Sequence, residues 1–214
     1  MGAAARSGLR RRPGLAGRRR DAPAGGHGLA AGPRRARLAA ARGHHRGAGG
    51  GGRGRAGAVR YVEAPADYRP APGDAPSVFL AGGITHCPPW QAAAARALAD
   101  FVVLNPRRAE FDVSDPSQTD VQIAWEYAHL RRADVTLFWF PECDPSLTVQ
   151  PITLYELGFA AAVPGRRLVV GADPGYPRRA DVVTQLALAR PDLPVHGTLA
   201  ETLAAARTLL AGLT

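Results

Sequence analysis

Lysine is absent from this chain of 214 residues, and cysteine, methionine and aromatic residues are scarce. Two cysteines are too few for a disulfide framework, and neither stands at the spacing of a metal site. No run of 18 apolar residues occurs, so we expect no membrane-spanning helix and no membrane partner. With few cysteines and no membrane segment, we expect a protein of the reducing cytoplasm.

Charge and glycine are distributed unevenly along the chain. Residues 1–60 contain 15 of the arginines, 16 of the 25 glycines and a single acid, Asp21. The remaining residues contain 12 arginines and 17 acids, so the net charge of +9 arises from the first 60 residues. Because that segment has few large apolar residues and no helical or strand period, we predict a disordered Arg/Gly/Ala-rich tail over residues 1–58.

Three interpretations of this tail stay open. The true start of the protein lies near Val59, or the tail is simply solvated, or it is an arm that binds nucleic acid. Nucleic acid is the least favoured partner, because the tail lacks the aromatic residues that stack on bases. A transit peptide fits the arginine content but not the near absence of serine.

Apolar runs and helix formers alternate along residues 77–214, which we expect to form one domain. The proline-rich residues 59–76 are predicted to be an extended lead-in without secondary structure. Predicted strands cover residues 77–84, 101–106, 134–140, 167–172 and 193–197. Predicted helices cover residues 90–99, 119–133, 153–163, 181–189 and 199–212. This alternation predicts a doubly wound α/β fold, Rossmann-like or flavodoxin-like, with a parallel five-stranded sheet.

Ligands of doubly wound sheets bind at the carboxyl ends of the strands. At this edge we expect AGGI (81–84), NPRR (105–108), FPECDPS (140–146) and GADPGY (171–176). Candidate binding residues here are Gly82, Gly83, Ile84, Asn105 and Arg107, and the Arg107 guanidinium either meets a phosphate or is solvated. Residues 77–214 contain neither a G-x-G-x-x-G motif nor a P-loop, so dinucleotide and P-loop nucleotide sites lose their main support.

One acid, Glu156, interrupts the apolar run TVQPITLYELGFAAA (148–162). An ionised carboxylate in apolar surroundings is unfavourable unless it is compensated. We place Glu156 in the first turn of its helix, where backbone amides favour a negative charge. The structural alternative is a capping box in which Thr153 is the N-cap and Glu156 the third helical residue.

A second acid in apolar company is Glu126, in the segment IAWEYA of the preceding predicted helix. Its side chain either faces the same edge of the sheet or pairs with a neighbour on the surface. Two carboxylates in one cleft are the arrangement that glycosyl chemistry uses, one as nucleophile and one to handle the proton.

Other polar residues favour structural roles. Asp134 precedes a predicted strand at its amino end, where a cap is favoured over catalysis. His86 and His129 have no partner at metal-ligand spacing, and we expect neither a metal nor a cofactor. Cys87 follows the glycine turn and is a candidate to line the cleft, although no Cys/His pattern surrounds it.

Taken together, AGGI, NP, AWEYAHLRRAD and YELGFA resemble the nucleoside 2-deoxyribosyltransferase superfamily over about residues 77–200, most of all its deoxyribosyltransferase-like branch. The resemblance implies a doubly wound parallel sheet and cleavage of an N-glycosidic bond through a covalent deoxyribosyl–Glu intermediate. It implies that Glu156, in the ELG motif, is the nucleophile. It implies that Glu126, which stands where related enzymes usually have Asp, handles the leaving base.

Two positions depart from the family pattern. Phe79 stands where the family has a tyrosine whose hydroxyl holds the nucleophile. Gln150 stands six residues before Glu156, where related enzymes have Asp or Ser, and Gln150 or Thr153 is expected to replace that contact. With these departures the resemblance leaves the substrate open.

The expected function is cleavage or transfer at the N-glycosidic bond of a nucleoside or nucleotide. The alternative is a non-catalytic module that binds a nucleotide-like ligand on the same fold. A phosphoribohydrolase is disfavoured because residues 77–214 contain no P-G-G-x-G-T loop. The resemblance also implies a homo-oligomer, and we expect an apolar helix face around Trp125 and Tyr127 to be the contact surface.

Overall fold

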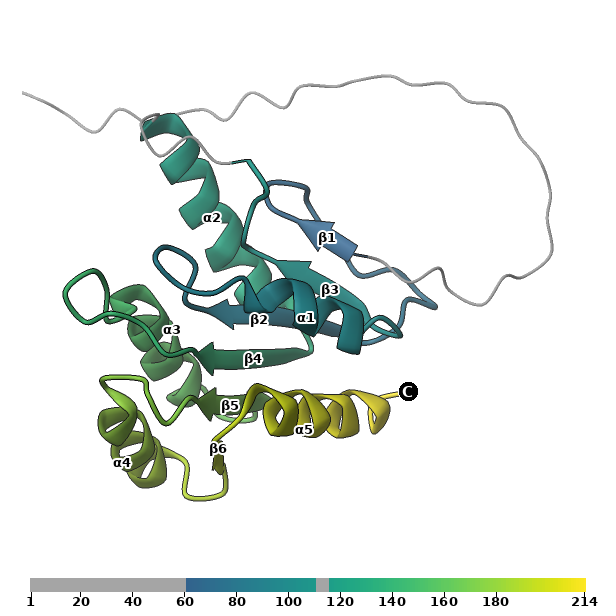
Figure 1. The fold of residues 1–214 in the computed structure, drawn as a ribbon. Helices are drawn as coiled ribbons and strands as arrows, with labels where there is room; N and C mark the ends of the chain where they lie inside the picture. The colour runs from purple at the N-terminus through teal and green to yellow at the C-terminus, as the bar shows by residue number, and fades with distance from the viewer. Residues whose placement is uncertain (1–60, 111–115) are drawn as a thin grey trace, which may run out of the picture. The chain divides into compact units, whose positions relative to one another are not determined.

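A parallel sheet of six strands with five flanking helices carries the predicted site (Figure 1). The structure is a computed structural model, and it describes residues 61–110 and 116–214. The predictions of a disordered tail over residues 1–58 and of a start near Val59 concern residues outside this part of the chain.

The elements follow the predicted alternation. The strands are β1 (Tyr61–Glu63), β2 (Ser77–Gly82), β3 (Val102–Asn105), β4 (Val135–Phe140), β5 (Leu168–Ala172) and β6 (Val195–His196). The helices are α1 (Trp90–Ala97), α2 (Pro116–Arg132), α3 (Pro151–Ala161), α4 (Arg179–Ala189) and α5 (Leu199–Ala211). All neighbouring strands pair in parallel, in the spatial order β1-β3-β2-β4-β5-β6. The α/β fold is therefore confirmed.

The sheet has six strands rather than five because the lead-in contributes β1. Tyr61, Val62 and Glu63 pair with residues 103–105 of β3. The prediction of an extended lead-in without secondary structure was wrong here. A run of three residues followed closely by Pro65 is too short to show a strand period, and pairing with the buried strand β3 supplies the hydrogen bonds it needs.

Helices cover both faces of the sheet. All six residues of β4 are buried, and alternate side chains point to opposite faces. Phe138 and Phe140 belong to the core that α2, α3 and α4 cover, whereas Leu137 and Trp139 belong to the core under α1 and α5 (Figure 1). Burial on both faces explains why the strands read as continuous apolar runs rather than as alternating patterns.

The strand order reverses between β2 and β4, the two central strands. From β2 the chain passes outward to β3, returns through α2 to β4, and then continues outward on the other side to β5. Connections that leave adjacent strands in opposite directions open a crevice at the carboxyl ends of those strands. Here that crevice lies between the loop after β2 and the loop that leads from β4 into α3.

Within the part of the chain that the structure describes, no helix combines the length and the apolar character needed to cross a membrane.

Candidate active site

A cavity of about 260 Å³ lies at the carboxyl ends of β2 and β4. The predicted site residues that line it are Phe79, Gly82, Gly83, Ile84, Glu126, Gln150, Thr153 and Glu156. The remaining lining residues are Ala81, Thr85, Pro106, Thr148, Pro151 and Ile152. Carboxylates from two different helices, α2 and α3, thus share one cavity.

Glu156 lies in the second turn of α3, not in the first turn as the sequence suggested. The helix begins at Pro151, and the N-cap residue Gln150 makes no capping bond with its side chain. Proline suits the first helical position, because it has no amide hydrogen to satisfy and its φ is already helical. Thr153 is therefore inside the helix, and the capping box of Thr153 with Glu156 does not form.

The Glu156 carboxyl is not held ionised by the helix amides. Burial raises the pKa of Glu156 to about 8, and repulsion by the Glu126 charge acts in the same direction. Burial also raises the pKa of Glu126, although a hydrogen bond from Gln122 partly opposes this. Because the charge on Glu126 is what repels Glu156, Glu126 ionises first. With a pKa of about 8, Glu156 retains its proton at neutral pH.

Gln122 orients the Glu126 carboxylate from one turn earlier on α2. Its Nε2 donates to Glu126 Oε1 at 2.9 Å and to the Pro106 carbonyl at 2.7 Å. Sequence reasoning missed Gln122. The spacing of four residues on one predicted helix was the signal that would have found it.

Gln150 has an unusual conformation at the mouth of α3. Its backbone is left-handed, with φ of 53° and ψ of 53°. Its buried Nε2 donates to the Pro141 carbonyl at 3.0 Å and to Cys143 Sγ at 3.5 Å. Its Oε1 is buried and has no hydrogen-bond partner among the described residues. Although Gln150 lines the cavity, this oxygen is not accessible from it while the side chain keeps its position.

Gly83 allows the Gln150 side chain to approach the loop after β2. A Cβ atom at position 83 would lie 2.7 Å from Gln150 Cδ and 2.4 Å from Cys87 Sγ. Both distances are too short for non-bonded atoms, so any larger residue would displace the amide or the thiol. The predicted glycine turn therefore serves close packing of the cavity wall.

Phe79 lies on β2 and faces the cavity without a hydroxyl group. Its side chain is buried, and its ring centroid lies 6.0 Å from that of Trp125. The ring contributes apolar surface but cannot donate a hydrogen bond to Glu156. This lack is a second reason, besides burial, why a charge on Glu156 is poorly compensated.

Asn105 and Arg107 are not among the residues that line the cavity. Asn105 Nδ2 donates to the Tyr61 hydroxyl at 2.7 Å, and its Oδ1 accepts from the Arg107 amide at 3.0 Å. The Arg107 guanidinium donates to the carbonyls of Cys87 and Pro88, at 3.4 and 3.0 Å. These two side chains fasten the loop after β3 to its neighbours.

Asp134 has the structural role that the sequence favoured. Its Oδ2 accepts from the Ser77 amide at 2.8 Å and from the Ser77 hydroxyl at 2.7 Å. The bonds join the starts of β4 and β2 at the edge of the sheet away from the cavity. His86 is exposed, and Cys87 is buried behind Gly83 without lining the cavity.

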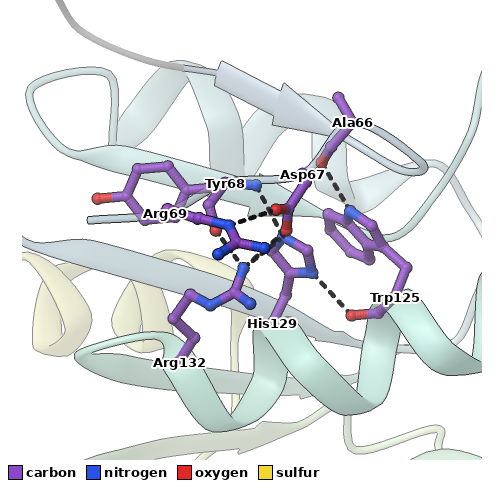
Figure 2. A network of polar contacts seen from close by, with 7 residues as sticks. All are labelled: Ala66, Asp67, Tyr68, Arg69, Trp125, His129 and Arg132. Atoms are coloured by element: carbon purple, nitrogen blue, oxygen red, sulfur yellow. Dashed lines mark hydrogen bonds and ion pairs between the residues drawn. The ribbon is translucent and has the colours of Figure 1, made fainter. Parts of the chain in front are cut away.

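His129 anchors the lead-in segment to α2 (Figure 2). Its ring stacks on Trp125 at a centroid distance of 4.0 Å, and its Nε2 accepts from the Tyr68 amide at 3.0 Å. Its Nδ1 lies 2.8 Å from the Trp125 carbonyl and donates to it, because Nε2 is the acceptor. Burial lowers the pKa of His129, so the ring is neutral at neutral pH.

Among the described residues, no group of three or more His, Cys, Asp and Glu side chains could hold a metal ion. What the cavity does offer is two carboxyl groups, of which Glu156 keeps its proton at neutral pH. Chemically, this pair can donate a proton to a leaving group and attack or stabilise a cationic carbon.

Comparison with known proteins agrees with this chemistry. Residues 75–176 match the model of a family described as nucleoside 2-deoxyribosyltransferase like. No curated protein matches the chain. The matched segment contains Phe79, Glu126, Gln150 and Glu156, and its family description points to glycosyl transfer at nucleosides. The resemblance inferred from the sequence is thus confirmed, and residues 75–176 are a nucleoside 2-deoxyribosyltransferase-like segment.

Proposed function

We propose that the protein cleaves or transfers at the N-glycosidic bond of a (deoxy)nucleoside or nucleotide through a covalent glycosyl–Glu156 intermediate. The observation that carries this proposal is the coupling of two half-buried carboxyls in one cavity. The charge of Glu126 helps to raise the pKa of Glu156 to about 8, so in our proposal the pair holds one proton and one negative charge at neutral pH. A double displacement at an anomeric carbon needs both.

The reaction begins when that proton is on Glu126 and the charge is on Glu156. The Glu156 carboxylate attacks the anomeric carbon, the carbon–nitrogen bond breaks, and the proton of Glu126 passes to the leaving base. In the second step Glu126 accepts a proton from water or from an acceptor base, which attacks the anomeric carbon and releases Glu156. Water as acceptor gives hydrolysis, and a second base gives transfer.

The walls of the cavity suit a sugar and a base. Phe79, Ile84 and Ile152 provide apolar surface, while Thr148, Thr153 and Gln150 provide polar groups. The hydroxyl groups of Thr148 and Thr153 are suitable hydrogen-bonding partners for a sugar hydroxyl. These residues position the anomeric carbon relative to the carboxylates in our proposal.

A direct test follows base release from a panel of deoxynucleosides, ribonucleosides and their monophosphates by chromatography. We expect Glu156→Gln to fold normally and to lose base release by roughly three orders of magnitude or more. The matched control is Glu142→Gln, which removes an exposed acid that does not line the cavity. A glycosyl adduct on a peptide containing Glu156, detected by mass spectrometry, would support the covalent step, and near-normal activity of Glu156→Gln would exclude it.

A non-catalytic module that binds a nucleotide-like ligand is the second candidate. Two observations favour it: Phe79 offers no hydroxyl to the nucleophile, and the pKa of Glu156, about 8, keeps this group protonated at neutral pH. A protein that is stabilised against heat by a nucleoside but releases no base from any member of the panel would favour this candidate.

We further propose that the protein is a homo-oligomer. Exposed apolar side chains gather on adjoining faces of α2 and α3, with Tyr127 at 62% exposed and Tyr155 at 76% exposed. The Arg131 guanidinium joins the two faces, because it lies 4.1 Å from the Tyr127 ring and 4.3 Å from the Phe159 ring. Trp125, which we expected on this surface, instead points inward and is 6% exposed.

Light scattering at micromolar concentration tests the oligomer. We expect the wild type to exceed the mass of one chain and Tyr155→Arg to reduce that mass, because a charge would then be buried in the contact. A wild-type protein that stays monomeric at this concentration contradicts the proposal.

A further inference from the structure

The two cysteines of the chain belong to different loops, yet they lie close enough for Cys143 to influence the pKa of Cys87. Cys87 is in the loop after β2, and Cys143 is in the loop after β4. These strands are parallel neighbours, and Gly82 pairs with Trp139 at their carboxyl ends. Both loops therefore leave the sheet at the same edge, beside the cavity.

The Cys143 thiol contacts the Gln150 side chain. The Cys87 thiol lies against Gly83, which borders the same side chain. Cys143 Sγ accepts from Gln150 Nε2 at 3.5 Å and lies 3.5 Å from the Thr148 carbonyl. Cys87 Sγ lies 2.4 Å from the point that a Cβ of residue 83 would occupy, and Gln150 Cδ lies 2.7 Å from the same point. The Cys143 side chain also interacts with Cys87 and, after burial, contributes to raising the pKa of Cys87.

We propose that Cys87 and Cys143 are a redox-modification site, which forms a reversible disulfide and thereby displaces Gln150 from its place in the cavity wall. Neither thiol lines the cavity or has a role in the proposed glycosyl chemistry. The pair therefore adds a means of control to the site.

The oxidant is a small disulfide such as oxidised glutathione. Cys143, which is only partly buried, attacks one sulfur as its thiolate, forms a mixed disulfide and releases one glutathione thiolate. Cys87 then attacks Cys143 Sγ, forms the protein disulfide and releases the second glutathione. The two thiol protons end on the two released glutathiones, so one disulfide is reduced for each disulfide formed.

The order of attack follows from the surroundings of the two sulfurs. Cys87 is buried, and burial raises its pKa to about 11. Little of its thiolate form is therefore present to attack a disulfide from solution. Its attack becomes intramolecular once Cys143 carries the mixed disulfide. The partly exposed residue is thus the first to react, and the buried residue resolves the adduct.

Formation of the disulfide changes the partners of Gln150. Bonded sulfurs lie about 2.05 Å apart with a fixed dihedral preference, so Cys143 Sγ must turn toward Cys87. Gln150 Nε2 then loses one acceptor and keeps the Pro141 carbonyl. Because Gln150 also has a left-handed backbone at the start of α3, the loop that carries it is the part of the wall that moves.

The full-length protein, reduced and then treated with oxidised glutathione, tests the bond by mass spectrometry. We expect the loss of two hydrogen atoms, a Cys87–Cys143 cross-linked peptide, and reversal by dithiothreitol. Cys87→Ser should instead accumulate the glutathione adduct on Cys143, whereas Cys143→Ser should remain largely unmodified. A wild-type protein that stops at the adduct, or that cross-links only between chains, overturns the proposal.

Displacement of Gln150 is measured by hydrogen exchange of peptides from residues 141–150. We expect faster exchange in the oxidised wild type than in the reduced form, and no change in Cys143→Ser treated in the same way. Unchanged exchange in a fully cross-linked protein overturns the displacement. The effect on turnover rests on the proposed function: oxidation should slow base release by at least about tenfold. If the reduced protein releases no base, the proposed function fails, while the mass and exchange results still decide this inference.

Discussion

Two carboxylates at opposite ends of the strand β4 have contrasting surroundings. Asp134 precedes the strand and accepts two hydrogen bonds from Ser77, at 2.8 and 2.7 Å. Glu156 comes after the strand, in the second turn of α3, where it is half-buried and shares the cavity with another carboxyl. The same chemical group is thus compensated at one edge of the sheet and left uncompensated at the other.

The contrast distinguishes Asp134, which stabilises the fold, from Glu156, which lines the cavity. Ser77 donates two hydrogen bonds to Asp134, and these bonds join the starts of two strands. Burial and repulsion disfavour the ionised form of Glu156, so free energy is released when this carboxyl binds a proton or a cationic carbon. A buried acid without partners is therefore a better sign of chemistry than an acid with many.

After Glu156→Gln, the largest expected effect comes from Glu126→Gln, which removes the repulsion from the cavity. The pKa of Glu156 should fall from about 8, because burial then remains as the only cause of its shift. Base release should fall about 10²–10⁴-fold, and least for a base that leaves easily without a proton. Carbon-13 NMR titration reports the pKa, and chromatography reports the rate. An unchanged pKa of Glu156 would show that the two carboxyls do not interact.

The next effect is on stability as a function of pH. Because the pKa of Glu156 is about 8 in the folded protein and near 4.5 when unfolded, the folded state holds a proton that the unfolded state has lost between these values. The free energy of unfolding should therefore fall as pH rises through this window, by up to about 1.4 kcal/mol per pH unit. The difference between wild type and Glu156→Gln in urea unfolding isolates this slope. The same dependence of the free energy of unfolding on pH in both proteins would contradict this prediction.

At the other edge of the sheet, Asp134→Ala should lower the free energy of unfolding by about 1–3 kcal/mol, because Ser77 loses a charged acceptor. Ser77→Ala should have a similar effect, and the double variant should lose less than the sum of the two. Base release should be unchanged. Additive losses in urea unfolding would show that these residues do not act through each other.

The smallest effect concerns His129, which contrasts with Glu156 in the sign of its pH dependence. Burial lowers the pKa of His129 below its usual 6.5, so the unfolded state binds the proton first as pH falls. Stability should therefore decrease below about pH 6.5, by about 1 kcal/mol, as the bond from the Tyr68 amide is lost. His129→Gln keeps an acceptor and should remove the pH dependence. Thermal unfolding at mildly acidic and neutral pH measures both.

Much of the α/β alternation and both carboxylates could be predicted from the sequence, because buried strands and helix formers leave strong local patterns. The start of α3 was missed, although Pro151 suits a first helical position, since Gln150 caps the helix with its backbone alone. The raised pKa of Glu156 could not be predicted from local pattern, because it depends on Glu126 from another helix. The proximity of Cys87 and Cys143 likewise follows only from the pairing of β2 with β4.

The outermost strands of the sheet are its shortest members: β1 has three residues and β6 has two. Short outermost strands present few unpaired amides and carbonyls, and Pro65 follows closely on β1. The fold thereby protects itself against edge-to-edge aggregation and against growth into a continuous sheet with a second copy. The oligomer that we propose would therefore form through the helices, where the exposed aromatic side chains of α2 and α3 lie.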